Sequence, residues 1–369
     1  MKPEGLSLAN WREPPYQQYS FRHIDGILPV ARIGANASEA FSRGDLSPDS
    51  YRGADALKRL CQQTYGDALL VAQDGQIVFE WCREGVSLDD AHIVFSVSKS
   101  ITGMLTGIIV DEGRLDPGQG IVDHLPGVAG SAYEDATVRN LLDMTIATEF
   151  REEYLGEDGD YARYRRSTGW NPRAVSEEDH MESFLYGLPA SADPHGERFL
   201  YRSPNSDLLG LVCATAAGES IQSLLTSRLF KPLGCRGPAM ITVDGRGAAR
   251  TAGGICCTTE DLLRLGELMR CNGKWQGQQL IPTDWVEQCA SGGNPEAWKR
   301  GDMAYFLPNG CYRNQWYQDD GAFFAIGIHG QWLYVDRAAG LTVAKVSAYP
   351  MPVSDEMDLD TLNAFHGLR

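Results

Sequence analysis

The stretch FSVSKSITGMLTGIIV, residues 95–110, decides how the middle of this chain folds. Its apolar residues recur at helical spacing, at Ile101, Met104, Leu105, Ile108 and Ile109. This periodicity predicts a largely buried helix that begins near Ser96 and stops by Gly113. The same stretch therefore places a serine at a helix start and a lysine one turn further on.

Ser96 and Lys99 are three residues apart, so their side chains share one face of that helix and can touch. A serine hydroxyl becomes a useful nucleophile when a neighbouring group takes its proton. A lysine can do this if burial lowers its pKa, and the helix N-terminus favours a developing oxyanion. A serine at a helix start is also a common cap, so the motif needs a matching context.

That context begins with the segment ALLVAQDGQIVFEW, residues 68–81. Two β-rich runs meet at Asp74 and Gly75, a pair suited to the positive φ of a tight turn, and this predicts a hairpin. Strand patterns return near the C-terminus at 323–328, 331–335 and 341–347. Between the hairpin and these C-terminal strands, a capping pattern at Thr258 and Asp261 predicts the start of a helix.

Between these β-rich ends, residues 115–235 show short helical patterns and few strand signals. We therefore expect an α/β protein with a sheet domain built from residues 1–110 and 245–369. Residues 111–244 are expected to form a mainly helical inserted domain. The first forty or so residues indicate an irregular arm, which either packs across the lobes or mediates a homodimer.

Composition narrows the class of function. The chain has 369 residues, 43% of them hydrophobic, and a formal net charge of −16, which disfavours nucleic acids and anionic membranes as partners. Its nine cysteines show no zinc-site spacing, and adjacent Cys256 and Cys257 suit neither a disulfide nor a metal. No apolar leader or spanning segment is evident, so we expect a cytoplasmic protein that acts on a small molecule.

A second candidate motif lies in RFLYRSPNSDLLG, residues 198–210, where Tyr201 precedes a helical pattern. With Ser-x-x-Lys, this segment resembles the penicillin-recognising serine hydrolases, which include class C β-lactamases, DD-peptidases and related esterases. The resemblance implies their β-lactamase/DD-peptidase-like fold, an antiparallel sheet flanked by helices with an inserted helical lobe. It also implies that Tyr201 relays protons, with a pKa lowered by the nearby ammonium, and that Ser203 contacts substrate.

The third motif of that family, a cation followed by Thr and Gly, falls here on Ala325, Ile326 and Gly327. The cation is absent, which argues against penicillin or peptidoglycan recognition. The resemblance still implies an oxyanion hole from the backbone amides of Ser96 and Ile328, with Gly327 beside the substrate. His329 follows on the same strand, but side chains alternate there, so we leave it out of the catalytic set.

The segments MTIATEFREEY, STGW and AIGIHGQ are most similar to the nylon-oligomer (6-aminohexanoate-dimer) hydrolases. That similarity implies that Tyr154 hydrogen-bonds the scissile amide nitrogen and that Trp170 closes over the substrate's apolar chain. For both residues, the alternative is an aromatic side chain that is packed or exposed without a role in binding.

We therefore expect an enzyme that cleaves small linear amides or esters through an acyl-enzyme on Ser96, without a metal or organic cofactor. Hydrolysis of a 6-aminohexanoate dimer is the favoured reaction. A short-chain carboxylesterase would use the same residues, and a β-lactamase or DD-peptidase would keep Ser96, Lys99 and Tyr201. A binding protein that has lost its chemistry, or a structural protein with chance motifs, remains the alternative outside enzymes.

Overall fold

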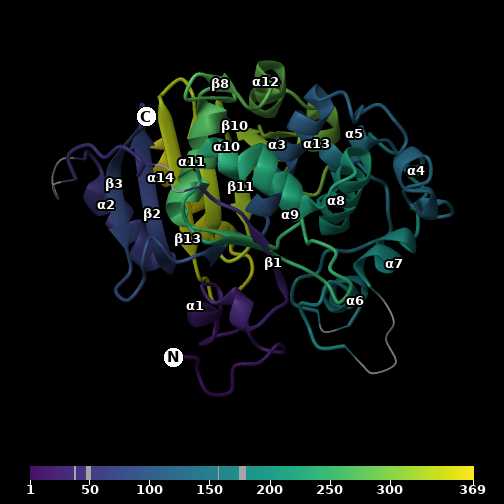
Figure 1. The fold of residues 1–369 in the computed structure, drawn as a ribbon, viewed down its shortest axis with the longest axis horizontal. Coiled ribbons are helices and arrows are strands. Elements are labelled where there is room, and N and C mark those ends of the chain that lie inside the picture. Colours follow the sequence, from purple (N-terminus) through teal and green to yellow (C-terminus); the bar gives the residue numbers. More distant parts are fainter. Residues whose placement is uncertain (37–38, 47–50, 157, 174–179) are drawn as a thin grey trace.

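The computed structural model describes residues 1–36, 39–46, 51–156, 158–173 and 180–369. Within these residues, seven strands form one antiparallel sheet (Figure 1). Their spatial order is β3 (Gln76–Cys82), β2 (Gly66–Gln73), β13 (Leu341–Ser347), β12 (Gln331–Asp336), β11 (Ala322–Gly327), β10 (Trp316–Asp319) and β9 (Cys311–Arg313). Since β2 pairs with β13, distant parts of the chain meet at the centre of the sheet.

The large sheet is buried on both faces, and successive apolar side chains of β2 pack on opposite faces. Leu69 and Val71 pack in a cluster with residues of α2 (Ala54–Gln63) and α14 (Asp355–His366). Leu70 and Ala72 belong to the larger cluster, which includes residues of α3 (Val97–Asp111) and α11 (Thr259–Arg270). The resulting helix, sheet and helix layers confirm the predicted α/β fold class.

The local predictions agree closely with these elements. Asp74 and Gly75 have φ of +48° and +82°, so the predicted hairpin turn uses two left-handed residues. α3 begins at Val97 and is buried along most of its length. The Thr258 side chain accepts a hydrogen bond from the backbone of Asp261 and caps α11.

The middle of the chain is mostly helical and lies beside the large sheet (Figure 1). Its elements are α4 (Ile121–His124), η2 (Pro126–Val128), α5 (Val138–Leu142), α6 (Asp160–Ser167), α7 (Met181–Tyr186), α8 (Ser203–Ala217), α9 (Ile221–Leu224), η3 (Leu225–Phe230) and α10 (Lys231–Leu233). α3 packs against both α8 and β11, and so it joins the helical region to the sheet. Helices α12 (Thr283–Ser291) and α13 (Pro295–Lys299) follow α11 in the chain.

A second, smaller sheet leads into the residues of interest. Its order is β1 (Val30–Ile33), β5 (Ala239–Thr242), β6 (Ile255–Cys257) and β4 (His92–Ile93), and β7 (Lys274–Trp275) pairs separately with β8 (Gln278–Gln279). β5 lies inside the expected helical insert of 111–244, yet it pairs with β1 from the N-terminal arm. β4 ends three residues before Ser96, so this sheet positions the start of α3.

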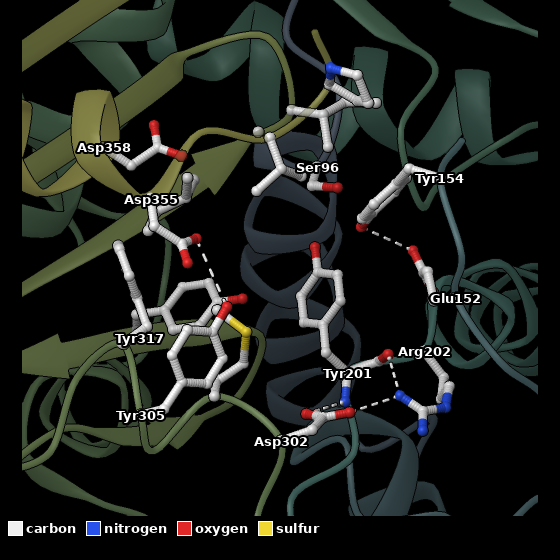
Figure 2. Close-up of a pocket in the computed structure, with 17 residues that line it drawn as sticks. Ser96, Glu152, Tyr154, Tyr201, Arg202, Asp302, Tyr305, Tyr317, Asp355 and Asp358 are labelled. Carbon is white, nitrogen blue, oxygen red and sulfur yellow. Dashed lines mark hydrogen bonds and ion pairs between the residues drawn. The ribbon is translucent and has the colours of Figure 1, made fainter. Parts of the chain in front are cut away.

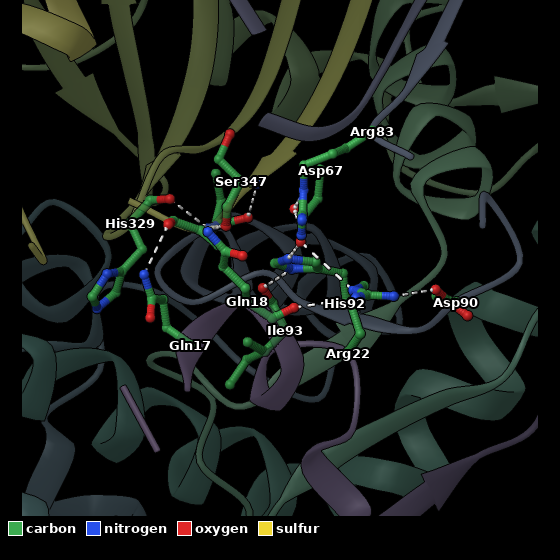
Figure 3. A network of polar contacts seen from close by, with 12 residues as sticks. Gln17, Gln18, Arg22, Asp67, Arg83, Asp90, His92, Ile93, His329 and Ser347 are labelled. Atoms are coloured by element: carbon green, nitrogen blue, oxygen red, sulfur yellow. Dashed lines mark hydrogen bonds and ion pairs between the residues drawn. The ribbon is translucent and has the colours of Figure 1, made fainter. Parts of the chain in front are cut away.

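The N-terminal arm packs on the core as an irregular segment with α1 (Gln17–Ser20) and η1 (Ile24–Gly26). Trp11 and Phe21 of the arm are fully buried. A polar network holds the arm to the large sheet through Asp67 (Figure 3). Arg22 of the arm lies 3.7 Å from the Asp67 carboxylate and 2.9 Å from that of Asp90.

Asp67 is completely buried and accepts two hydrogen bonds from Arg83, at 2.9 and 2.7 Å. Burial would raise the pKa of its carboxyl group, but contacts with His92 and Arg83 outweigh burial and lower this pKa. Asp67 therefore stays ionised at neutral pH and neutralises the guanidinium groups around it.

Among the described elements, no single helix is both long enough and apolar enough to cross a bilayer. Only the bent helix pair Ser203–Ala217 and Ile221–Leu233 meets both criteria when its two helices are taken together.

Replacing Asp67 should destabilise the fold, since the arginines around it would lose their shared buried partner. We expect Asp67→Ala to lower the free energy of unfolding in urea by about 3 kcal/mol at pH 7. Asp90→Ala is the matched control, because Asp90 is 35% exposed and should contribute at most about 1 kcal/mol. Because folding lowers the pKa of Asp67, the stability difference between the wild type and Asp67→Ala should disappear as the pH falls below about 4. Equal losses in the two variants would contradict this account of the arm.

Candidate active site

Ser96 stands at the junction between the small sheet and α3. The preceding residue, Phe95, has a left-handed backbone with φ of +42°, which is costly for a bulky side chain. This sharp turn carries Ser96 to the wall of a cavity of about 350 Å³ (Figure 2). Only 9% of the Ser96 surface is exposed, so a substrate must enter the cavity to reach it.

Lys99 contacts the serine from inside the protein. Its Nζ donates hydrogen bonds to Ser96 Oγ, at 2.8 Å, and to the carbonyl oxygen of Ala252, at 2.7 Å. The side chain is 1% exposed, and this burial lowers the pKa of Lys99 to about 8. An appreciable fraction of Lys99 is therefore neutral near pH 7 to 8 and able to accept a proton.

The position of Lys99 depends on a second layer of buried groups. Asp207 accepts a hydrogen bond of 2.7 Å from the backbone N–H of Ala252, whose carbonyl holds Lys99. Asp207 also accepts the Tyr164 hydroxyl and lies 3.5 Å from a guanidinium nitrogen of Arg250. The carboxylate thus lies behind the lysine, while Ser96 and a carbonyl contact Lys99 directly.

Tyr201 completes the cluster from the segment that enters α8. Lys99 Nζ lies 5.0 Å from the centre of the Tyr201 ring, and the Tyr201 hydroxyl points toward Ser96 (Figure 2). The lowered pKa expected for this phenol is not found. Burial, followed by the negative charge of Glu152, raises the pKa of Tyr201. Tyr201 is therefore a neutral hydroxyl that can donate or relay a proton.

Two backbone amides are available for an oxyanion. Ser96 and Ile328 both line the cavity, and neither amide N–H donates a hydrogen bond to another described residue. β11 ends at Gly327 and β12 begins at Gln331, so the chain reverses through Ile328, His329 and Gly330. His329 and Gly330 have φ of +61° and +83°. This tight turn leaves the Ile328 amide outside the ladder of the sheet, as an oxyanion hole requires.

His329, which we left out of the catalytic set, points away from the nucleophile. Its ring is buried, with Nδ1 2.8 Å from the carbonyl oxygen of Tyr349 and contacts to Phe21 and Phe95. Burial lowers the pKa of His329 to about 3. It is therefore neutral across the pH range in which Lys99 changes charge.

Glu152 is a site residue that sequence reasoning missed. It lines the cavity and accepts a 3.0 Å hydrogen bond from the Tyr154 hydroxyl. It also accepts the backbone N–H and the hydroxyl of Ser203, the first residue of α8. A carboxylate satisfies a free N–H at a helix N-terminus, and this role has no local sequence signature when the two residues are about fifty apart.

The expected substrate-binding residues divide into two groups. Tyr154 and Gly327 line the cavity, as do the neighbouring Ile326 and Ile328. Ser203 is 4% exposed and lies behind Glu152 instead of on the cavity wall. Its hydroxyl is used in the capping arrangement, so the expected contact with substrate is not available in this structure.

Trp170 also lies outside the cavity lining, where we expected it to close over an apolar chain. It is 2% exposed, and its indole N–H donates a 3.0 Å hydrogen bond to Thr242 Oγ1. The Arg250 guanidinium stacks 4.0 Å from the ring centre, and Trp11 packs edge-on at 5.4 Å. Trp170 therefore supports the small sheet and the buried arginine.

The remainder of the cavity wall is aromatic and acidic. Tyr305, Phe306 and Tyr317 provide apolar surface, and Asp302, Asp355 and Asp358 provide carboxyl groups (Figure 2). Asp302 is paired with Arg202 at 2.6 Å, which anchors the segment that carries Tyr201. Burial raises the pKa of Asp358 to about 7. Within the described residues, no group of three His, Cys, Asp or Glu side chains is arranged to hold a metal ion.

Comparison with known proteins gives consistent results. The family model described as Beta-lactamase matches residues 54–367. The 6-aminohexanoate-dimer hydrolase of Paenarthrobacter ureafaciens is 32% identical over 353 residues, which cover 94% of this chain and 89% of that protein. Two solved structures share the fold. A putative 6-aminohexanoate-dimer hydrolase from Bacillus anthracis has a TM-score of 0.88 at 21% identity, covering 100% of this chain and 97% of that one. A family VIII carboxylesterase has a TM-score of 0.66 at 15% identity, covering 89% of this chain and 99% of that one.

The lowered pKa of Lys99 predicts how any Ser96-dependent turnover varies with pH. If neutral Lys99 takes the serine proton, kcat/KM for p-nitrophenyl acetate should rise about tenfold per pH unit below pH 8 and level off above it. Lys99→Arg should remove this rise together with at least about 99% of the activity, since a guanidinium stays charged. His329→Gln should keep the same apparent pKa. A flat wild-type profile from pH 6 to 9 would contradict the assignment of Lys99 as the base.

The close approach of β11 to the Ser96 turn predicts a second effect. A Cβ added at Gly327 would lie 2.6 Å from the carbonyl oxygen of Val94, so one of the two backbones would have to move. We expect Gly327→Ala to displace the Ile328 amide and to lower kcat by at least about a hundredfold. Gly26→Ala is the control, because no atom lies within 4 Å of a Cβ there and its φ lies outside the left-handed region. A Gly327→Ala enzyme with full kcat would show that Ile328 does not stabilise the oxyanion.

Proposed function

Because the chain belongs to the beta-lactamase family of serine hydrolases, we propose that it cleaves small linear amides through an acyl-enzyme on Ser96. The substrate type that we favour is the linear dimer of 6-aminohexanoate. The observation that carries this proposal is the 2.8 Å contact between Lys99 Nζ and Ser96 Oγ at the wall of the first cavity. The relative from Paenarthrobacter ureafaciens supports the choice of substrate.

In the proposed first half-reaction, neutral Lys99 takes the Ser96 proton while Oγ attacks the amide carbon. The negative charge that develops on the carbonyl oxygen is stabilised by the amides of Ser96 and Ile328. Tyr201 then gives its hydroxyl proton to the amide nitrogen and regains a proton from the Lys99 ammonium. The carbon–nitrogen bond breaks, the amine leaves, and the acyl group remains on Ser96 as an ester.

In the second half-reaction, water attacks the ester carbon through the same groups. Its proton passes to Lys99, and the bond between the acyl carbon and Ser96 Oγ breaks. The proton returns to Oγ and the acid leaves. The raised pKa of Tyr201 supports this division of roles, with Lys99 as the base and Tyr201 as the relay.

The charges of the cavity support a substrate with an amino end. Asp355 lines the cavity, and its carboxylate lies near the Tyr305 hydroxyl, at 3.5 Å. An ammonium group at the end of a flexible chain would be attracted there, and the apolar atoms of Tyr305 and Phe306 would cover its methylenes. Arg202 also lines this cavity, but its pairing with Asp302 leaves it poorly suited to bind the carboxylate of a penicillin.

A carboxylesterase activity is the second candidate. An alkoxide or phenoxide leaves more readily than an amine, so a site whose relay tyrosine has a raised pKa should cleave activated esters easily.

We place the activity in the cytoplasm. The nine unpaired cysteines support that compartment, because reduced thiols are characteristic of it.

The test is hydrolysis of the linear 6-aminohexanoate dimer, p-nitrophenyl acetate and nitrocefin by the wild type and by Ser96→Ala. We expect wild-type cleavage of the dimer and the acetate ester, little turnover of nitrocefin, and a loss of at least about a thousandfold in Ser96→Ala. Mass spectrometry of the protein after rapid quenching should detect the acyl group on Ser96. Activity of Ser96→Ala equal to that of the wild type would refute the mechanism, and nitrocefin as the best substrate would refute the amide assignment.

A further inference from the structure

A second cavity, of about 360 Å³, adjoins the first one on the far side of Tyr154, Ile328 and Pro352. These three residues line both cavities. The rest of the second wall comes from the N-terminal arm, from α6 and from the segment before α14, which includes Met351. A substrate bound at the Ile328 amide would therefore have this cavity next to its scissile group.

Two arginine side chains from distant parts of the chain, Arg12 and Arg165, line this cavity. Arg12 of the arm donates a 2.5 Å hydrogen bond to Asn171 Oδ1 and stacks over Trp11, 5.3 Å from the ring centre. Arg165 of α6 donates to the carbonyl oxygens of Tyr154 and Gly156, at 3.3 and 2.6 Å. Both guanidinium groups are thus held in place by neutral partners.

Neither Arg12 nor Arg165 forms an ion pair with a described residue, and the Nε atom of each is buried without a hydrogen-bond partner. Burial, followed by repulsion from Arg165, lowers the pKa of Arg12 to about 10. Burial and the charges of Arg166 and Arg250 likewise lower the pKa of Arg165. Among the described residues, the positive charge of these two arginines is therefore not neutralised by an ion pair, in a chain whose net charge is −16.

The other charged groups at this cavity do not remove the imbalance. Glu13 lines it as well, but its side chain is exposed to solvent, where its attraction is screened. Arg250 lies behind the wall and is compensated by Asp207 at 3.5 Å. An anionic group entering the cavity would thus meet two preorganised guanidinium groups.

We propose that Arg12 and Arg165 form a subsite for a carboxylate at the leaving-group end of the substrate. Guanidinium groups bind carboxylates through paired, charge-assisted hydrogen bonds, and they do so most strongly where water is excluded. This inference rests on the proposed amide hydrolysis and adds a requirement to it. The amine that leaves must carry an acidic group, as 6-aminohexanoate does.

The arrangement of the two cavities gives the substrate a direction. Asp355 lies in the first cavity and the arginines lie in the second, with Ser96 and Ile328 on the wall of the first and Ile328 shared. A linear molecule with an ammonium at one end and a carboxylate at the other is attracted in one orientation and repelled in the other. The acyl half then occupies the first cavity and the leaving half the second.

This subsite depends on a part of the chain that precedes the Beta-lactamase match, which begins at residue 54. Arg12 belongs to the arm, and the arm is fixed by buried Trp11 and by the network of Arg22 with Asp67 (Figure 3). A fixed guanidinium loses little conformational entropy when it binds an anion. The arm therefore acts as a specificity element added to the family's catalytic domain.

The first test uses a matched substrate pair, the linear dimer with its terminal carboxylate and the same dimer ending in a carboxamide. We expect wild-type kcat/KM to favour the carboxylate by at least about tenfold. Arg12→Gln and Arg165→Gln should each reduce this preference by at least about tenfold, mainly through KM. Arg163→Gln, on the exposed face of α6, is the control and should keep the wild-type preference. An unchanged preference in both cavity variants would overturn the proposal.

The second test is independent of turnover. Calorimetric titration of Ser96→Ala with 6-acetamidohexanoate and with its carboxamide should show at least about tenfold tighter binding of the acid, lost when Arg12→Gln or Arg165→Gln is added. Thermal melting verifies that each variant is folded. If the dimer is not cleaved but the acid still binds through the arginines, the subsite stands and the proposed substrate fails. Equal binding of the acid and the amide would overturn the subsite, whatever the enzyme cleaves.

Discussion

The buried ammonium group of Lys99 is the constraint on which the site depends. A lysine with 1% exposure is stable only if its polar atoms are satisfied, and here Ser96 Oγ and the Ala252 carbonyl supply the two hydrogen bonds. Burial lowers the pKa of Lys99 to about 8, and no carboxylate of a described residue forms an ion pair with it that would offset this effect. A direct ion pair would have kept the lysine charged and useless as a base.

Much of the surrounding structure serves to hold this lysine correctly. Asp207 orients Ala252 through its backbone N–H, and Arg250 with Tyr164 keeps Asp207 in place. Glu152 anchors the start of α8 near Tyr201 and adds a negative charge that keeps the phenol protonated. The cluster therefore separates two functions, since the base is a lysine with a lowered pKa and the relay is a phenol with a raised one.

The large sheet provides the second requirement, which is a backbone amide at a defined distance from the nucleophile. β11 runs beside the Ser96 turn so closely that only glycine fits at position 327. The chain then reverses immediately through residues with positive φ, and this frees the Ile328 amide. The same turn forms part of the wall between the two cavities, so the position of the oxyanion also determines where each end of a substrate lies.

The sequence by itself determined the elements whose signals are local. Helical periodicity located α3 and put Ser96 and Lys99 on one face, and the Asp74–Gly75 pair located the hairpin. The resemblance of residues 198–210 to the penicillin-recognising serine hydrolases indicated Tyr201. Only the tertiary structure decided the environment of these groups. The pKa of Tyr201, the capping of Ser203 by Glu152, the burial of Trp170 and the meeting of Arg12 with Arg165 all join residues that are far apart in the chain. Burial and charge act through space, and a pattern of neighbouring residues holds no record of which distant side chains will surround them.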